Sequence, residues 1–323
     1  MTLFYRKFSL SLPRLRFTSP IGYNISMKQL AIIGSTASGK SDLALRLAQE
    51  YNALILSIDS LSIYKEIDIA SAKPSASELL SVEHFGIDRL RPDETASVIT
   101  FIDEYNTIRI QALRESKNII IVGGSSFYLK SMIEGLSKIP NYSPATLQKA
   151  NAMIMDLGEC HRLLQKIDPL TMQKITPTDA YRIEKMLLIY LETGIAPSEW
   201  FHAHPPQPII TDCPVFNLQV GRDVLRERIS LRTEKMVNSG LIDEIAELER
   251  VYGRFPNSMK AIGIIEVLEY LDGKITKDEM ISLISTHTAQ LAKRQQTFNT
   301  HQFELSASGS ADVLYKAASA ILK

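Results

Sequence analysis

The sequence predicts an α/β protein whose parallel sheet is flanked by helices and whose chain contains an all-helical insertion. Four short apolar runs, rich in β-branched residues, are expected to form strands, and each is followed by a turn signal or a helical pattern. They cover residues 29–33, 54–58, 119–122 and 215–220. Alternating strands and helices are typical of parallel sheets, whose ligands bind beyond the carboxyl ends of the strands.

A phosphate-binding motif directly follows the first predicted strand. The pattern G-x-x-x-x-G-K-[ST] is matched without a gap by Gly34, Ser35, Thr36, Ala37, Ser38, Gly39, Lys40 and Ser41. A helix is predicted next, over residues 42–50, which is the context that such a P-loop requires. Its glycines let backbone N–H groups point at phosphate oxygens, its lysine supplies a cation, and its final serine can bind Mg²⁺. We therefore expect a P-loop NTPase-like sheet that binds a phosphate compound here.

Helical periodicity replaces the strand signal between Pro140 and Pro214. It is clearest over residues 180–192, where apolar side chains recur on one face. Further helices are predicted over residues 222–251 and 278–296, where the chain returns to the core. The middle of the sequence therefore reads as a helical domain inserted into the α/β core.

The chain is expected to have three parts. Residues 1–26 carry four basic residues and no acidic one, a pattern shared by organellar presequences and by translated stretches upstream of a start. We expect the second, because no amphipathic Arg/Ser pattern is visible and Met27 opens the first strand. The predicted parts are a disordered or non-native extension (1–26), a catalytic core (27–140 and 209–323) and a helical insertion (141–208).

Composition limits the classes of function. The formal net charge is zero and the pI is near 7.0, so a broad nucleic-acid-binding surface, which is usually basic, is not indicated. No apolar run reaches the roughly 18 residues of a membrane-spanning helix, and we expect no membrane partner. Neither Cys160 nor Cys213 has a second Cys or a paired His at metal-ligand spacing. Such cysteine usage is typical of the reducing cytoplasm.

Two features indicate which chemistry the loop serves. The third strand ends in Gly123 and Gly124, where P-loop ATPases and GTPases carry the Asp that holds Mg²⁺. A nucleotide-driven motor or switch is therefore disfavoured. Asp59 follows the second strand and should lie beside the loop, because neighbouring parallel strands end at the same crevice. It can act as a base, hold Mg²⁺ through water or only cap a turn, and the residues alone leave these roles open.

An ordered series of motifs resembles the tRNA dimethylallyltransferases, also called tRNA isopentenyl transferases. The series extends over about residues 28–303, which is most of the chain. Its parts are D-S-L-S-I-Y at 59–64, D-I-A-S-A-K-P at 68–74, H-F-G-I-D at 84–88, P-D-E at 92–94, G-G-S-S-F-Y at 123–128, D-A-Y-R at 179–182, G-L-I-D-E at 240–244, A-I-G at 261–263 and K-R-Q at 293–295.

The resemblance implies a transferase that moves the dimethylallyl group of dimethylallyl diphosphate to the exocyclic amine of the adenosine 3′-adjacent to the anticodon, with Mg²⁺. It implies that Asp59 takes the amine proton and that Ser125 supplies a hydroxyl contact that the family takes from Thr. Lys40 then stabilises charge on the departing diphosphate. The P-loop and Arg232 become the diphosphate site, and Ser41 becomes the metal ligand.

The implied partner is the anticodon stem-loop of a tRNA, whose target base must be flipped into the crevice. The insertion, expected to contact tRNA, holds six Lys/Arg against seven Asp/Glu, whereas residues 286–302 include a Lys and an Arg and no acid. Phosphate contacts are therefore expected mainly in that last segment. The expected tRNA-binding residues are Asp59, Ser60, Leu61, Ser62, Ser125, Arg182, Lys185, Lys260, Lys293 and Arg294.

The sequence departs from the family pattern at a few positions. Ser62 stands where the family has Gln, Ile264 and Ile265 stand where it has Tyr and Lys, and Phe298 stands where Trp is usual. None of these positions supplies the P-loop or Asp59. We therefore expect the chemistry to be kept and the RNA contacts to be rearranged.

Three alternative functions can be weighed against the resemblance. An adenylate isopentenyltransferase would act on a free nucleotide and would have no use for the insertion. A P-loop small-molecule kinase would need an Arg-rich lid, which is not visible in the sequence. A non-catalytic RNA-binding module would not need an intact P-loop beside Asp59. The expected protein is a monomeric tRNA prenyltransferase of the cytoplasm.

Overall fold

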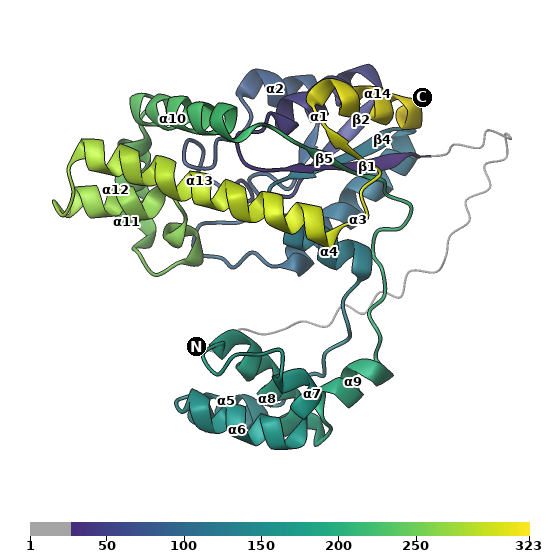
Figure 1. The fold of residues 1–323 in the computed structure, drawn as a ribbon, viewed down its shortest axis with the longest axis vertical. Coiled ribbons are helices and arrows are strands. Elements are labelled where there is room, and N and C mark those ends of the chain that lie inside the picture. Colours follow the sequence, from purple (N-terminus) through teal and green to yellow (C-terminus); the bar gives the residue numbers. More distant parts are fainter. Residues whose placement is uncertain (1–26) are drawn as a thin grey trace, which may run out of the picture.

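The computed structural model describes residues 27–323, and the predicted extension over residues 1–26 lies outside that range. The core is one parallel sheet with the strand order β3-β2-β4-β1-β5-β6 (Figure 1). Its strands are β1 (Gln29–Gly34), β2 (Ala53–Ser57), β3 (His84–Phe85), β4 (Asn118–Gly123), β5 (Val215–Leu218) and β6 (Ala307–Gly309). The predicted α/β class with a parallel sheet is confirmed.

The central strands are buried on both faces. Leu30, Ile32 and Ile33 of β1 are completely buried, as are the three isoleucines of β4. Strands covered on both sides need continuous apolar runs, and such runs are what the sequence pattern detects. The pattern does not predict β3 and β6, because these edge strands have only two and three residues.

Helices cover both faces of the sheet (Figure 1). On one face, α1 (Lys40–Glu50) and α14 (Ala311–Leu322) pack through Leu43, Leu47 and Leu314. The other face is covered by α3 (Val98–Glu115), α4 (Ser126–Glu134), α11 (Leu241–Tyr252), α12 (Ile264–Leu271) and α13 (Lys277–Gln302). The remaining core helices are α2 (Ala76–Ser81), α10 (Arg222–Asn238) and the short 3₁₀ helix η1 (Asn257–Lys260).

The helices predicted after β5 differ in detail from those observed. The segment 222–251 is divided into α10 and α11 at Gly240, whose φ of 101° lies in the left-handed region that favours glycine. Helix α13 starts at a capping box made by Thr276 and Glu279, and it extends six residues past the predicted end at residue 296. This extension carries α13 along α4 and the carboxyl edge of the sheet.

The insertion is all-helical and has its own apolar core. It contains α5 (Pro144–Met153), α6 (Leu157–Ile167), α7 (Pro169–Met172), α8 (Ala180–Thr193) and α9 (Pro197–Ala203). Leu164, Ile183 and Leu187 are completely buried in that core. Figure 1 shows it as a lobe joined to the core by two linkers, which meet where Leu136 pairs with Gln207.

Residues 27–323 contain no helix that is both long and apolar enough to cross a membrane.

Candidate active site

The P-loop curls around the N-terminus of α1. Ala37 and Gly39 have φ values of 60° and 90°, and the turn is closed by the Ser38 N–H, which donates to the Ser35 carbonyl at 3.3 Å. Glycine adopts such a φ without strain. The first amides of α1 are thereby presented at the carboxyl end of β1, where a helix N-terminus favours bound anions.

Lys40 lies at the base of this loop. Its Nζ donates to the Ser35 carbonyl at 3.2 Å. Burial lowers the pKa of Lys40 from 10.5 to about 8, the negative charge of Asp59 opposes this change, and the positive charge of Arg232 adds to it. An anion bound at the loop would favour the charged form of Lys40.

Two arginines from α10, one helical turn apart, contact the loop. Arg232 Nη1 donates to Thr36 Oγ1 at 3.4 Å, and Arg228 Nη1 donates to the Ser38 carbonyl at 3.1 Å. Burial lowers the pKa of Arg232, and Asp59 opposes the change. Sequence reasoning missed Arg228. Arg228 lies four residues before Arg232 on a predicted helix, and residues at this spacing share a helix face. That spacing was the signal that could have identified it.

Asp59 follows β2 and lies close to both cations. Its charge acts on Lys40 and on Arg232, as expected for a residue at the end of a neighbouring parallel strand. Its Oδ1 also accepts hydrogen bonds from the N–H groups of Leu61 at 2.9 Å and Ser62 at 3.2 Å. Asp59 therefore caps its own turn, and its charge acts on the cations beside the P-loop.

Ser125 ties the end of β4 to the segment that carries Asp59. Its Oγ accepts from the Ser60 N–H at 3.0 Å, and its N–H donates to the Ile58 carbonyl at 3.2 Å. A Cβ on Gly123 would lie 2.5 Å from the Ile58 carbonyl oxygen. No side chain fits there, and so the Asp of nucleotide-hydrolysing P-loop proteins has no room at this position.

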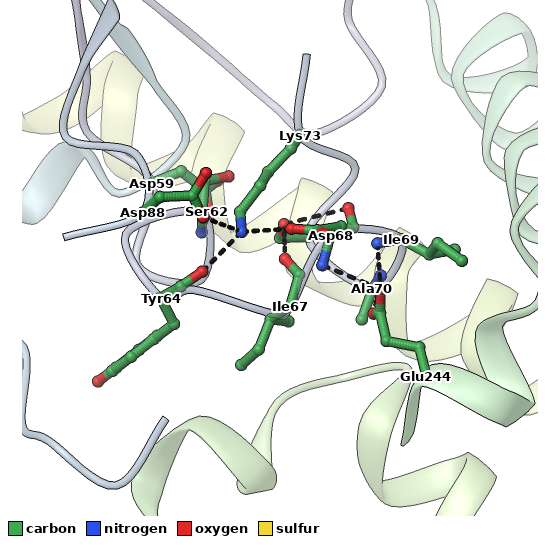
Figure 2. Close-up of polar contacts among 11 residues, drawn as sticks. Asp59, Ser62, Tyr64, Ile67, Asp68, Ile69, Ala70, Lys73, Asp88 and Glu244 are labelled. Atoms are coloured by element: carbon green, nitrogen blue, oxygen red, sulfur yellow. Dashed lines mark hydrogen bonds and ion pairs between the residues drawn. The ribbon is translucent and has the colours of Figure 1, made fainter. Parts of the chain in front are cut away.

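An ion cluster centred on Lys73 organises the loop that follows Asp59 (Figure 2). The Lys73 ammonium donates to Asp68 at 2.6 Å, to Asp88 at 2.5 Å and to the Tyr64 carbonyl at 2.7 Å. The Lys73 side chain is only 6% exposed. The Asp88 N–H in turn donates to the Ser62 carbonyl at 3.2 Å, so the cluster is connected to the turn that Asp59 caps.

Glu244 of α11 holds the same loop from the other side (Figure 2). Its carboxylate accepts from three consecutive N–H groups, those of Asp68, Ile69 and Ala70, at 3.0, 2.7 and 2.9 Å. Hydrogen bonds to an ionised carboxylate are among the strong ones. The loop is therefore fixed at both ends of the D-I-A-S-A-K-P segment.

The amino-acid sequence is similar to those of known proteins. A family model described as IPP transferase matches residues 62–302, which is more than two thirds of the chain. The chain belongs to the IPP transferase family. Two similar relatives are named tRNA dimethylallyltransferase. The one from Sulfurimonas denitrificans is 55% identical over 278 residues, covering 86% of this chain and 94% of the relative. The one from Sulfurovum sp. is 51% identical over 294 residues, covering 91% and 98%.

Solved structures agree with the IPP transferase assignment. The full-length tRNA isopentenylpyrophosphate transferase of Bacillus halodurans has a TM-score of 0.67 at 28% identity, covering 92% of this chain and 97% of that one. A eukaryotic dimethylallyltransferase described as acting on tRNA has a TM-score of 0.79 at 25% identity, covering 92% and 78%. The predicted α/β fold with a parallel sheet matches the fold of these IPP transferase structures.

The predicted RNA-binding residues lie in separate regions of this IPP transferase. Ser60 is exposed, Leu61 is half-buried and the Ser62 side chain is buried. The Ser62 side chain can therefore offer little surface to an RNA. Lys293 and Arg294 are exposed on α13, and Lys260 is exposed on η1, where its Nζ donates to Asn257 Oδ1 at 3.4 Å. These core residues thus lie on the turn after β2, on η1 and on α13.

The two RNA-binding residues predicted in the insertion lie on α8, in the other lobe (Figure 1). Arg182 forms an ion pair with Asp179 at 3.2 Å, and the Lys185 ammonium lies 5.4 Å from the centre of the Tyr181 ring. Tyr181 is 70% exposed. Both cations and the ring are therefore accessible, although no described contact joins them to the P-loop.

Metal binding at the P-loop would depend on few protein groups. Among residues 27–323, no group of three or more His, Cys, Asp or Glu side chains is arranged to hold a metal ion. Ser41 is exposed in the first turn of α1. Mg²⁺ usually keeps several waters and binds through one or two protein groups plus substrate phosphates. A hydroxyl beside a phosphate loop fits that mode of binding.

Proposed function

We propose that this chain transfers a dimethylallyl group from dimethylallyl diphosphate to the exocyclic amine of the adenosine 3′-adjacent to the anticodon in tRNA, and that it releases diphosphate. The observation that carries the proposal is the position of Asp59, whose charge acts on both Lys40 and Arg232. A base therefore lies beside a cationic phosphate site, as attack of an amine on a diphosphate ester requires. Membership of the IPP transferase family supports the choice of substrates.

The P-loop side of the crevice binds the leaving group. When the bond between the allylic carbon and the diphosphate oxygen breaks, negative charge grows on the diphosphate. Preorganised cations and N–H groups stabilise such charge most in a site shielded from water. Lys40 and Arg232 supply the cations, the first turn of α1 supplies the N–H groups, and Arg228 holds the loop through the Ser38 carbonyl.

Asp59 acts on the acceptor side. The adenine amine is a weak nucleophile because its lone pair is delocalised into the ring. A carboxylate that takes the amine proton during attack makes the nitrogen a better nucleophile, an effect of about 10²–10⁴-fold for a positioned base. Ser125, bonded to the Ser60 N–H, lies next to the same turn. Its hydroxyl would contact the flipped base.

Mg²⁺ would bind at Ser41 together with diphosphate oxygens and water. When bound there, it would neutralise part of the charge that develops on the leaving group. The chain would supply only part of the ligand set, and the diphosphate and water would supply the rest. We therefore also propose that Mg²⁺ affinity depends on bound diphosphate.

The tRNA would lie across both lobes, with its anticodon loop over the crevice. Lys293 and Arg294 on α13 and Arg182 on α8 are exposed cations that can contact phosphates, and Lys185 on α8 is a half-buried one. We also propose that the enzyme works as a monomer in the cytoplasm. Its two free thiols, Cys160 and Cys213, suit a reducing compartment.

A transfer assay tests the proposal. The protein is incubated with Mg²⁺ and labelled dimethylallyl diphosphate, and with tRNA, AMP or no acceptor. Label is expected in tRNA alone, and nuclease digestion should place it in the adenosine next to the anticodon. Label in AMP would indicate an adenylate isopentenyltransferase, and ATP turnover without prenyl transfer would indicate a kinase. Either result would overturn the proposal.

A further inference from the structure

Two side-chain amides on one face of α13 connect the two halves of the crevice. Gln295 Oε1 accepts from the Thr36 N–H of the P-loop at 2.8 Å, and Gln295 Nε2 donates to the Gly124 carbonyl at 2.9 Å. The Gln295 amide therefore has one partner on the P-loop and one in the segment after β4. We call Gln295 and Asn299, which makes a similar pair of contacts, the amide clasp.

Asn299, one helical turn further along α13, repeats this arrangement. It is completely buried. With its amide oriented to satisfy its surroundings, it accepts from the Gly34 N–H at 3.3 Å and donates to Ser126 Oγ at 2.7 Å. The two side chains together join both ends of the Gly34–Thr36 segment to the Gly124–Ser126 segment.

The joined segments carry the two reacting sides of the proposed reaction. The P-loop segment leads to Lys40, where the diphosphate would bind. The segment after β4 carries Ser125, whose Oγ holds the Ser60 N–H next to Asp59. A Cβ on Gly124 would lie 2.6 Å from Gln295 Nε2, so this close approach also accounts for a glycine at this position.

We infer that the amide clasp sets the distance between the diphosphate site and the acceptor site, and that Gln295 is a positioning residue for prenyl transfer. This inference rests on the proposed function. Transfer between two bound substrates depends steeply on their alignment, and a displacement of about 1 Å can lower the rate by about 10²-fold. Both ends of the Gln295 amide are engaged by backbone groups. It acts through the two backbone groups that it holds.

The test replaces Gln295 by methionine, which keeps the length and volume of the side chain and removes both hydrogen bonds. Gln49 is exposed near the end of α1 that is remote from the P-loop, so Gln49→Met is the control for the same substitution on a helix. Three quantities are measured for each protein: the single-turnover transfer rate with both substrates saturating, the Kd of inorganic pyrophosphate by calorimetry, and the midpoint of thermal unfolding.

Gln295→Met is expected to lower the single-turnover rate roughly 10–100-fold while the pyrophosphate Kd changes less than about threefold. Gln49→Met should match the unchanged protein. An unchanged rate, or a rate loss that disappears at saturating diphosphate substrate, overturns the inference. If Gln295→Met does not unfold cooperatively, Gln295→Ala replaces it with the same expectation, because it also removes both hydrogen bonds, adds no charge and has a high helix propensity. Absence of transfer by the unchanged protein would instead refute the proposed function.

Discussion

The ammonium of Lys73 lies 2.5 Å from the carboxylate of Asp88, which joins the loop after β2 to the segment that follows the edge strand β3, 15 positions further along the chain. Lys73 is buried while Asp88 is about half exposed. Two of the Lys73 partners, Tyr64 and Asp68, lie on the loop after β2, and the third, Asp88, anchors this loop to the segment after β3. Asp59 starts this loop, and its orientation depends on how well the loop is held.

Replacing Lys73 by methionine should destabilise the protein by about 1–2 kcal/mol, because three hydrogen bonds to one buried ammonium are lost and two carboxylates remain unpaired at the surface. Thermal unfolding measures the effect. Lys65→Met is the control, since Lys65 is exposed on the same loop. Equal unfolding midpoints for the two variants would contradict the role given to the Lys73 cluster.

Diphosphate binding should weaken as the pH rises above about 8. Burial lowers the pKa of Lys40 to about 8, so its ammonium is charged below that pH and increasingly neutral above it. If only the charged form binds well, pyrophosphate affinity falls roughly tenfold per pH unit once the pH is well above this pKa. Calorimetry from pH 6.5 to 9.5 measures the pyrophosphate Kd at each pH. Lys40→Arg should remove the change near pH 8, and the idea fails if that variant keeps the same pH profile.

Asp59→Asn should lower the transfer rate by about 10²–10⁴-fold, because the amide can cap the turn but cannot accept the amine proton. Pyrophosphate binding should not weaken, since one negative charge is removed beside Lys40 and Arg232. Quench-flow transfer assays and calorimetry measure the two effects. Persistence of near-normal turnover would show that another group is the base.

Gly123→Ala should destabilise the core by about 1–3 kcal/mol, because the added Cβ would lie 2.5 Å from the Ile58 carbonyl oxygen and β2 or β4 would have to shift. Gly221→Ala is the control, since a Cβ at Gly221 meets no atom within 4 Å. Chemical denaturation of both variants gives the comparison. A tolerated alanine at residue 123 would refute the steric reason given for the missing Asp.

Lys293→Gln and Arg294→Gln should each weaken tRNA binding and reduce the slope of log affinity against log salt by about 1, the result expected when one phosphate contact is lost. Binding is measured by fluorescence anisotropy at several salt concentrations. Lys277→Gln serves as the control, because Lys277 is exposed at the opposite end of α13. A slope that stays constant in both variants would exclude α13 as a phosphate-binding surface.

Sequence reasoning reached the parts of the site that depend on local patterns. The P-loop was predictable because its glycines and Lys40 are contiguous, and the strands were predictable because burial on both faces demands continuous apolar runs. Asp59 could be placed from the rule that parallel strands end at one edge.

The contacts that complete the site could not be predicted in this way. Arg228 and Gln295 reach the P-loop across 190 and 259 residues of sequence, and no periodicity links positions so far apart. The exact path of α13 decides which of its side chains faces the loop. Likewise, the burial of Ser62 follows from the tight turn at Asp59, which the motif alone does not reveal.

The two linkers meet at the Leu136–Gln207 pair, and this has a consequence for how the sequence can evolve. Gly135 has a positive φ, and a Cβ there would overlap the backbone of Gln207, so the chain leaves the core and re-enters it at one point. The segment between these two residues has its own apolar core, so a change of length within it need not move β4 or β5. Substrate range in this architecture can therefore diversify by exchange of a module, with the catalytic core left intact.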